Sequence, residues 1–299
     1  MYIDLSKLND GFSSKLRVIS FFMAIVIIKR LKKKLYIYEK KTRESPFLFT
    51  DLCSIKNFKI IKLKNKPNSE IIFNPYNYSI TLDLLKKKYH INNYQIKRFN
   101  FISDNSYKYY IPKKIIQKKI KKIKLPRKFV GIHIRSTDRE INLRNFIKRV
   151  QFSEMIFDFQ INNMIKNVVS FLILKKLVKN VFICSDNNFY KKKAINLISS
   201  KVLIYQNKSK FNKNQFRQTN GLDFITELFC LSKSQIIIST VGGAVARSAF
   251  LISNKKIKIY KWIDLLNIFY FFRLLVIFIF HLKKLKNYFL IKLNFKNSV

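Results

Sequence analysis

Short apolar runs alternate with helix-length segments through residues 129–260, and this alternation restricts the fold more than any other feature of the chain. The apolar runs lie at 129–134, 181–186, 202–205, 235–240 and 257–260. The segments expected to be helical lie at 160–178, 190–199, 223–232 and 244–251. Strands that alternate with helices form parallel sheets, because parallel neighbours need a long crossover connection. The sequence therefore predicts a doubly wound α/β domain in the second half.

The first half opens with the same kind of unit. A strand is expected within 1–6, a helix over 15–30 and a second strand at 35–38. Gly11 lies between the first strand and the helix, where glycine lets backbone N–H groups approach a ligand at the positive helix end. Residues 63–110 show no clear pattern, and 112–126 has the composition of a basic amphipathic helix followed by a break. We therefore expect a domain boundary near residue 125.

Polar residues follow three of the expected strands of the second half. They are His133, Arg135, Asp138 and Glu140 after the first strand, Asp186 after the second, and Thr240, Gly242 and Gly243 after the fourth. The carboxyl ends of parallel strands meet at one edge of the sheet, and ligands of such sheets bind there. The alternative for the first cluster is a core strand that ends in a solvated polar turn. Three clusters at equivalent positions favour a binding site.

The chemistry of these clusters suits a phosphate. Arg135 can hold two phosphate oxygens through its planar fork, a contact that lysine does not reproduce. Gly242 and Gly243 precede an expected helix, so their backbone N–H groups and the helix dipole can face the same anion. Arg247, one helical turn further on, could pair with a phosphate or with a carboxylate such as Asp186. A buried salt bridge is the alternative for Arg247.

Asp223 lies near the expected start of its helix, where a carboxylate stabilises the N-terminus. The same side chain could instead accept hydrogen bonds from the amino and imino edge of a guanine. Both interpretations remain open from the residues alone.

The formal charge of +44 at pH 7 would ordinarily indicate nucleic acid or an anionic membrane as a partner. Here the excess is spread along the chain as Lys, beside abundant Ile, Asn, Phe and Tyr and few Gly and Pro, a bias typical of an AT-rich genome. No helix-turn-helix, RNA-recognition motif or zinc finger is recognisable. We expect no specific nucleic-acid partner, although solvated lysines could hold the protein near acidic lipid.

Cysteine and histidine spacing argues against metal and disulfide frameworks. Cys53, Cys184 and Cys230 are far apart and form no C-x-x-C pair, which suits a reducing compartment. His90, His133 and His281 form no metal-ligand spacing, so we expect no protein-built metal site.

The segment 265–280 is strongly apolar, but Arg273 interrupts it and it is shorter than a membrane span. Lysines follow it, as in helices that rest on a membrane surface. A terminal helix that packs back across the fold is the alternative. The expected organisation is a first α/β domain over 1–125, a second α/β domain over 126–262 and an apolar, basic helical tail over 263–299.

Two sets of motifs resemble one known family. In the second half they are Gly131-Ile-His-Ile-Arg135, Thr137-Asp138, 181–186 and 221–249; in the first half they are Gly11–Arg17, Lys34–Tyr38 and 46–51. The chain resembles the α-1,6-fucosyltransferases, which include the nodulation enzyme and the enzyme that fucosylates the N-glycan core. The resemblance implies a GT-B fold of two Rossmann-like domains, with 1–125 on the acceptor side and 126–262 binding the nucleotide sugar. It also implies GDP-fucose as donor, a glycan acceptor, transfer with inversion, and a role in bacterial glycan biosynthesis.

Residues at positions that match the family's motifs are expected to have the roles that the family gives them. The resemblance implies that His133 and Asp223 contact the guanine, that Arg135 binds the β-phosphate, and that Gly243 with its neighbours closes over the diphosphate. Asp138 and Glu140 lie where the family keeps its acidic and catalytic groups. Inverting transfer needs a general base for the acceptor hydroxyl and a cation for the departing diphosphate. Arg135 could be that cation without a metal; Glu140 or Asp138 would be the base, with Asp186 a third candidate.

Two departures from the family pattern leave alternatives open. Ser136 stands where the family often has a second basic residue, and Gly242, Gly243 and Ala244 stand where the core-fucosylating enzymes carry two serines and a glutamine. The alternatives are a GT-B transferase that uses another nucleotide sugar, an inactive homologue, and a non-catalytic protein that binds membrane surfaces or polyanions. The expected location is the cytoplasm, with possible attachment to the inner face of the membrane through the C-terminal segment.

Overall fold

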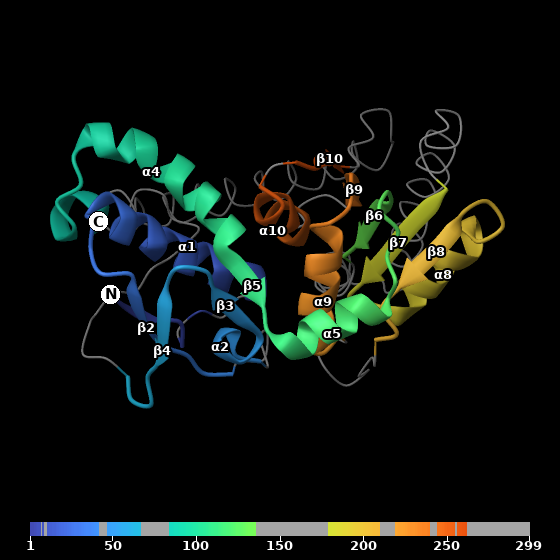
Figure 1. The fold of residues 1–299 in the computed structure, drawn as a ribbon, viewed down its shortest axis with the longest axis horizontal. Helices are drawn as coiled ribbons and strands as arrows, with labels where there is room; N and C mark the ends of the chain where they lie inside the picture. Colours follow the sequence, from blue (N-terminus) through green and yellow to red (C-terminus); the bar gives the residue numbers. More distant parts are fainter. Residues whose placement is uncertain are drawn as a thin grey trace, which may run out of the picture.

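A computed structural model describes residues 1–6, 8, 11–41, 47–66, 84–135, 179–209, 219–239, 244–254 and 256–261 of the chain. The described elements form two halves that lie side by side, with a small parallel sheet in one and a larger parallel sheet in the other (Figure 1). The predicted α/β class, with parallel sheets flanked by helices, is confirmed.

The first sheet has the strand order β1-β2-β4, and all its strands are parallel. Its members are β1 (Tyr2–Asp4), β2 (Lys34–Tyr38) and β4 (Lys59–Lys62). Helix α1 (Phe12–Ile28) connects β1 to β2, so the expected βαβ opening is present. The helix begins at Phe12 rather than at Lys15 and ends two residues earlier than expected. It is apolar on nearly all sides because it is buried on nearly all sides.

The rest of the first half supplies elements that the sequence pattern did not reveal. They are α2 (Phe49–Leu52), β3 (Cys53–Ile55), η1 (Leu84–Lys88), α4 (Asn93–Ser106), η2 (Tyr107–Tyr109) and β5 (Tyr110–Pro112). Strands β3 and β5 pair antiparallel. Helix α4 packs against α1, and a capping box begins it: Asn92 Oδ1 accepts from the Gln95 N–H at 2.8 Å, and Gln95 Oε1 accepts from the Asn92 N–H at 3.2 Å. The expected basic helix is α5 (Lys114–Lys122).

The second sheet has the order β10-β9-β6-β7-β8, again all parallel. Its strands are β6 (Val130–Ile134), β7 (Asn180–Ser185), β8 (Leu203–Gln206), β9 (Ile236–Ser239) and β10 (Lys258–Lys261). Its described helices are α8 (Asn188–Ile198), α9 (Gly221–Leu231) and α10 (Ala244–Ile252). Each corresponds to an element expected from the sequence. The expected helix over 160–178 and the tail over 263–299 lie outside the described residues.

The two faces of the second sheet belong to different apolar clusters. Val130, Ile132 and Ile134 of β6 pack with residues of α8, including Tyr190 and Ala194. The alternate side chains of β7, β9 and the start of β6 join a larger cluster that includes α9 and α10. Strand residues alternate between faces, so this division follows directly from the strand pattern.

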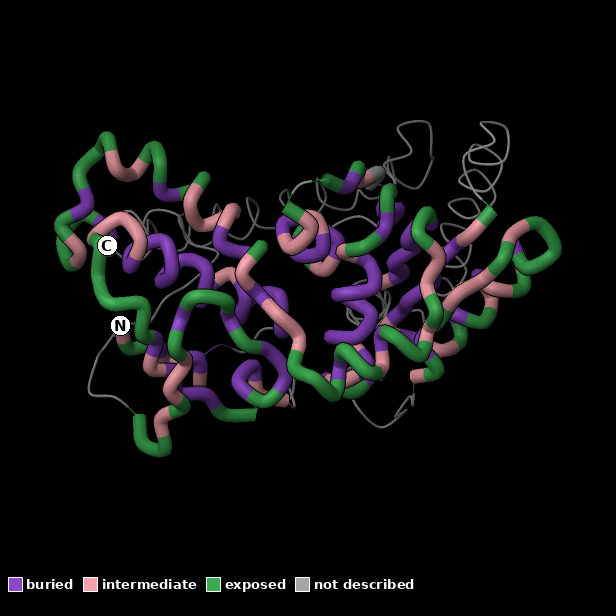
Figure 2. The backbone as a smooth tube through the Cα atoms, in the orientation of Figure 1, coloured by how far each residue is buried: buried purple, intermediate pink, exposed green. Residues whose placement is uncertain are grey.

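The larger cluster continues across both halves of the molecule. Phe12 of α1 lies 5.9 Å from Phe49 of α2 and 6.1 Å from Phe224 of α9, measured between ring centroids. Helix α9 also contacts α2, α5 and α10, and Figure 2 shows it buried along its length. The expected boundary at residue 125 falls in the turn between α5 and β6, while the apolar core is shared by residues on both sides of it.

The described residues include no helix with both the length and the hydropathy needed to cross a bilayer.

Glycine at position 221 permits the close approach of α9 to the first half. A Cβ atom built there would lie 2.1 Å from Cγ and 2.6 Å from Cβ of Phe47. We expect Gly221→Ala to lower the free energy of unfolding by about 1–3 kcal/mol through overpacking, although alanine is the better helix former. Urea unfolding measures the change. Adding Phe47→Gly, which removes the ring and the Cβ atom together, should remove most of the clash penalty, and an equal penalty of Gly221→Ala in both backgrounds would contradict this assignment.

Candidate functional site

The second sheet has its topological switch point between β6 and β9. The chain leaves β6 to reach β7 on one side, and returns later to place β9 on the other side. Ligands of open parallel sheets bind at such a point, outside the carboxyl ends of the strands. The polar residues at the ends of β6, β7 and β9 are therefore the first place to look for a site.

His133 and Arg135 occupy this position at the end of β6. His133 is 5% exposed, is paired in register with Ser239 of β9, and places Nδ1 3.2 Å from Ser239 Oγ. Arg135 is half-buried and follows the last residue of β6 directly. Both side chains thus lie where the sequence analysis placed a phosphate-binding group, beside the strand that leads to the predicted glycine turn.

The end of β7 comes beside the end of β6. Ile134 is paired in register with Ser185, and Asp186, which is half-buried, follows. The Asn187 N–H donates to Ser185 Oγ at 3.1 Å, and Asn187 Oδ1 accepts from the Phe189 N–H at 2.9 Å, which caps α8. The β7 turn is therefore tightly ordered, and it delivers Asp186 to the same edge of the sheet as Arg135.

Several predicted site residues lie outside the described residues. They are Asp138, Glu140, Thr240, Gly242 and Gly243. The last described residues before them, Arg135 and Ser239, lie at the ends of neighbouring strands.

Arg247 and Gly11 belong to the first turns of α10 and to the start of α1. Arg247 of α10 places Nη2 3.6 Å from Asp104 Oδ1 of α4, so the carboxylate that pairs with it belongs to the first half and is not Asp186. Gly11 is the N-cap residue of α1, and its carbonyl oxygen accepts from the Ser14 N–H at 3.0 Å. The contact of Phe12 with Phe224 sets the start of α1 beside the start of α9, so two helix N-termini lie close together.

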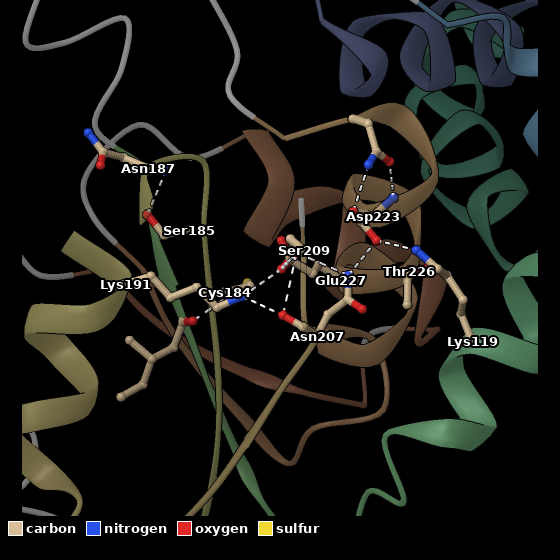
Figure 3. A network of polar contacts seen from close by, with 12 residues as sticks. Lys119, Cys184, Ser185, Asn187, Lys191, Asn207, Ser209, Asp223, Thr226 and Glu227 are labelled. Carbon is tan, nitrogen blue, oxygen red and sulfur yellow. Dashed lines mark hydrogen bonds and ion pairs between the residues drawn. The ribbon is translucent and has the colours of Figure 1, made fainter. Parts of the chain in front are cut away.

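Asp223 is 1% exposed and stabilises the start of α9 (Figure 3). Its Oδ2 accepts from Asn220 Nδ2 at 2.7 Å, and its own N–H donates to Asn220 Oδ1 at 2.8 Å. Its Oδ1 accepts from Asn207 Nδ2 at 2.9 Å and from Lys119 Nζ of α5. The cap of α9 is therefore Asn220 and not Asp223, whose carboxylate lies in the first turn of the helix and accepts from side chains. Its ion pair with Lys119 attaches α5 to α9.

Glu227, one turn further along α9, extends the same buried network. It accepts from Lys191 Nζ of α8 at 3.1 Å and from Ser209 Oγ at 3.0 Å. Lys191 Nζ also donates to the Asn207 carbonyl oxygen at 2.8 Å. Burial raises the pKa of Glu227 to about 7, although the ammonium of Lys191 opposes the shift. In Figure 3 these side chains converge from α5, α8, α9 and the segment after β8.

The sequence analysis missed this network, which lies toward the same edge of the sheet. Asn207 follows β8 directly, Lys191 lies in the first turns of α8, and Asp223 lies in the first turn of α9. The signal that could have revealed it is the spacing of two acidic residues. Asp223 and Glu227 are four apart in an otherwise apolar helix, so they share one face and must both be buried with partners.

The first sheet also carries a buried carboxylate at a strand end. Glu39 follows β2 and accepts from the Phe49 N–H at 2.8 Å, the Thr50 N–H at 2.9 Å and Thr50 Oγ1 at 2.6 Å. Lys15 Nζ lies 3.8 Å from Glu39 Oε2 and donates to the Phe47 carbonyl oxygen at 3.1 Å. Burial lowers the pKa of Lys15, and Glu39 opposes that shift. This group holds the start of α2, and with it Phe47 and Phe49, against α1 and α9.

Metal ligation finds no support in the part of the chain that the structure describes, where no group of three or more His, Cys, Asp or Glu side chains is gathered. What the site offers is a guanidinium, an imidazole and the capped N-terminus of α8 at one edge of a parallel sheet. Such an arrangement can bind an anion and fix the orientation of an attached ring.

Comparison with solved structures identifies the architecture. NodZ α-1,6-fucosyltransferase soaked with GDP-fucose is similar over 89% of this chain and 96% of that chain, with a TM-score of 0.52 and 13% identity. POFUT1 in complex with GDP-fucose is similar over 87% of this chain and 96% of that chain, with a TM-score of 0.54 and 10% identity. The fold is GT-B. At these identities the likeness establishes the fold alone. No family model and no curated protein matches the sequence.

The raised pKa of Glu227 predicts an unusual pH dependence of stability. Between its ordinary pKa of 4.5 and about 7, the folded protein holds a proton that the unfolded chain has released. Stability contributed by this group should therefore fall as pH rises through that range, by a total on the order of 3 kcal/mol. The measurement is the free energy of unfolding in urea at several pH values, compared with a variant that carries Glu227→Gln and Lys191→Met. Parallel pH profiles of the two proteins would contradict the assignment.

Proposed function

We propose that this protein is a glycosyltransferase that transfers fucose from GDP-fucose to a hydroxyl of a glycan acceptor, with inversion and without a metal ion. The observation that carries the proposal is the position of His133 and Arg135 at the switch point of a GT-B sheet. Solved structures that share this fold at TM-scores above 0.5 include NodZ α-1,6-fucosyltransferase soaked with GDP-fucose and POFUT1 in complex with GDP-fucose. Strand-end chemistry and fold thus support the same donor.

Arg135 is proposed to bind the β-phosphate of the donor. Its fork can donate two parallel hydrogen bonds to phosphate oxygens, and its charge is permanent. The predicted turn at Thr240, Gly242 and Gly243 comes between β9, which is the strand next to β6, and α10. Its backbone N–H groups would donate to the same phosphate. As the bond between fucose C1 and the diphosphate oxygen breaks, the electron pair stays on that oxygen. Arg135 then stabilises more charge than it did in the ground state, which lowers the barrier.

A carboxylate is proposed to accept the proton of the acceptor hydroxyl. The acceptor oxygen attacks C1 from the face opposite the diphosphate, forms the new glycosidic bond and passes its proton to the base, so the configuration at C1 inverts. Glu140 and Asp138 are the proposed bases, since they follow Arg135 in sequence, and Asp186 is the third candidate. Among these, Asp186 is described, and it lies half-buried beside the end of β6.

His133 and Asp223 are proposed to contact the guanine. The carboxylate of Asp223 already accepts from three side chains, so a guanine edge would have to displace one of these donors. Lys119 is the donor proposed to be displaced, because its side chain is 33% exposed and its ammonium can return to water, whereas Asn207 is buried and Asn220 caps α9. On this proposal Lys119 pairs with the carboxylate of Asp223 until the guanine arrives.

The location proposed is the cytoplasm, where nucleotide-sugar donors are available to an enzyme that builds glycan precursors. Attachment of the segment over 263–299 to a membrane stays a prediction, since that segment lies outside the described residues.

Removal of the guanidinium tests the proposal directly. Arg135→Ala should weaken GDP binding and reduce fucosyl transfer or donor hydrolysis by about 100- to 1,000-fold, as loss of an oxyanion donor does. Arg135→Lys should recover only part of the loss because it cannot form the fork. Isothermal calorimetry with GDP and turnover of GDP-fucose measure both effects.

The matched control is Arg127→Ala, which removes an exposed arginine before the opposite end of the same strand. It should leave GDP affinity unchanged. Preference for UDP- or ADP-sugars in the same assay would overturn the assignment of donor. Absence of any nucleotide-sugar binding would favour the non-catalytic alternative.

Substitutions of Asp223 and of its partner Lys119 distinguish a contact with the guanine from a purely structural role. Asp223→Asn should weaken GDP binding by about 10- to 100-fold, in line with loss of a hydrogen bond to a charged group, with little effect on ADP binding. Lys119→Met should not weaken GDP binding, because it removes the competing donor. Calorimetry gives the affinities and thermal unfolding reports stability. If Asp223→Asn weakened GDP and ADP binding equally, the carboxylate would have a structural role and would not recognise the guanine.

A further inference from the structure

Helix α4 carries a stripe of aromatic and basic side chains on its outer face. Among the described residues, the two most exposed large apolar side chains are Tyr94 at 70% and Phe101 at 65%, and both belong to this helix. Lys97 and Arg98, which are also exposed, lie between them. The spacing i, i+3, i+4 and i+7 places all four on one helix face. The opposite face buries Phe99 against Phe21 of α1, with ring centroids 4.8 Å apart.

Further basic residues lie at the same end of the molecule. Lys86, Lys87 and Lys88 of η1 are exposed and come shortly before α4. The turn between α1 and β2 adds Arg30, Lys32 and Lys33, with Leu31 48% exposed among them. Lys29 Nζ donates to the His90 carbonyl oxygen at 2.8 Å, which ties this turn to the segment between η1 and α4. Figure 1 shows α4 along the outer edge of the first half.

We propose that this basic–aromatic surface, formed by the outer face of α4, η1 and the α1–β2 turn, docks the protein on an anionic lipid bilayer. The argument is charge complementarity joined to exposed aromatic rings. The sequence has no Asp or Glu from 84 to 103 or from 11 to 38, so nothing within these segments offsets the lysines and arginines. Basic residues near a membrane are attracted to acidic headgroups, and aromatic rings settle at the headgroup level.

A lipid surface fits this face better than duplex nucleic acid does. A duplex presents its phosphates and groove edges while its base faces are stacked inside, so exposed Tyr94 and Phe101 would have no base to stack on. A bilayer offers both headgroup charge and an apolar layer a few ångströms below it, so lysine stems and aromatic rings can enter together. The surface lies on the first half, so docking would leave the strand ends of the second sheet open to a soluble donor.

Vesicle sedimentation of the full chain tests the proposal. The probes are vesicles of equal parts phosphatidylcholine and phosphatidylserine, and vesicles of phosphatidylcholine alone. We expect binding to the anionic vesicles that weakens with salt. A variant with Lys87→Glu, Lys97→Glu and Arg98→Glu should bind at least about 10-fold more weakly, from the attraction expected per basic residue near an acidic surface.

The matched control carries Lys118→Glu, Lys121→Glu and Lys122→Glu on the exposed face of α5, which changes the net charge by the same amount. It should keep most of the wild-type binding. A second variant, Tyr94→Ser with Phe101→Ser, should weaken binding at unchanged charge, while Phe189→Ser with Leu203→Ser, exposed on the other half, should not. All substituted side chains are exposed, so thermal unfolding should show each variant folded.

Equal loss in the two charge variants would mean that net charge alone drives adsorption, and would overturn the proposal. Unchanged vesicle binding in the Tyr94 and Phe101 variant would overturn it as well. The variants designed to weaken vesicle binding should bind GDP as tightly as the wild type does. A negative result in the vesicle assay can therefore be told apart from a failure of the proposed transferase activity.

Discussion

The packing of α9 between the two halves is the interaction on which the rest of the structure depends. The helix begins against Phe47 and ends against β6, and in both places a glycine makes room: Gly221 for the Phe47 ring and Gly131 for the Leu231 side chain. Between these ends its apolar residues complete the core that both halves share. Because the crossover from β8 to β9 is this same helix, its position also fixes where β9 pairs and where the switch point of the sheet lies.

Polar chemistry on α9 is arranged around that packing. Asp223 and Glu227 face away from the shared core and meet Lys119 and Lys191, each from a different helix. Buried charges of this kind are kept only when every one has partners, so the network specifies how α5, α8 and α9 are positioned. These contacts help to fix the geometry of the candidate site. Of the residues that form them, Asp223 is the one proposed to contact the ligand.

The sequence predicted the second half of the fold well because its elements are long or uniformly apolar. Buried parallel strands such as β6 and β7 are recognisable as apolar runs, and their order along the chain led to the switch point and to His133 and Arg135. Gly11, Asp186 and Arg247 were chosen from local patterns. Of these, Asp186 lies beside the end of β6, whereas Arg247 pairs with Asp104, a partner 143 positions earlier in the chain that no local pattern could reveal.

What the sequence did not predict depends on short elements and distant partners. Strand β4, Lys-Ile-Ile-Lys, has too few apolar residues to stand out, and it is a strand because β2 offers it an edge. β3 and β5 are three residues each and pair across a long stretch of chain. Helix α4 carries a detectable start signal in Asn92 and Gln95, but its exposed face is aromatic as well as basic, which obscures the helical pattern.

The apolar core that both halves share determines whether either half could fold alone. If the chain were cut near residue 125, each fragment would expose aromatic rings that now pack against the other half, Phe12 and Phe47 on one fragment and Phe224 on the other, so neither fragment should be a soluble, well-folded monomer on its own.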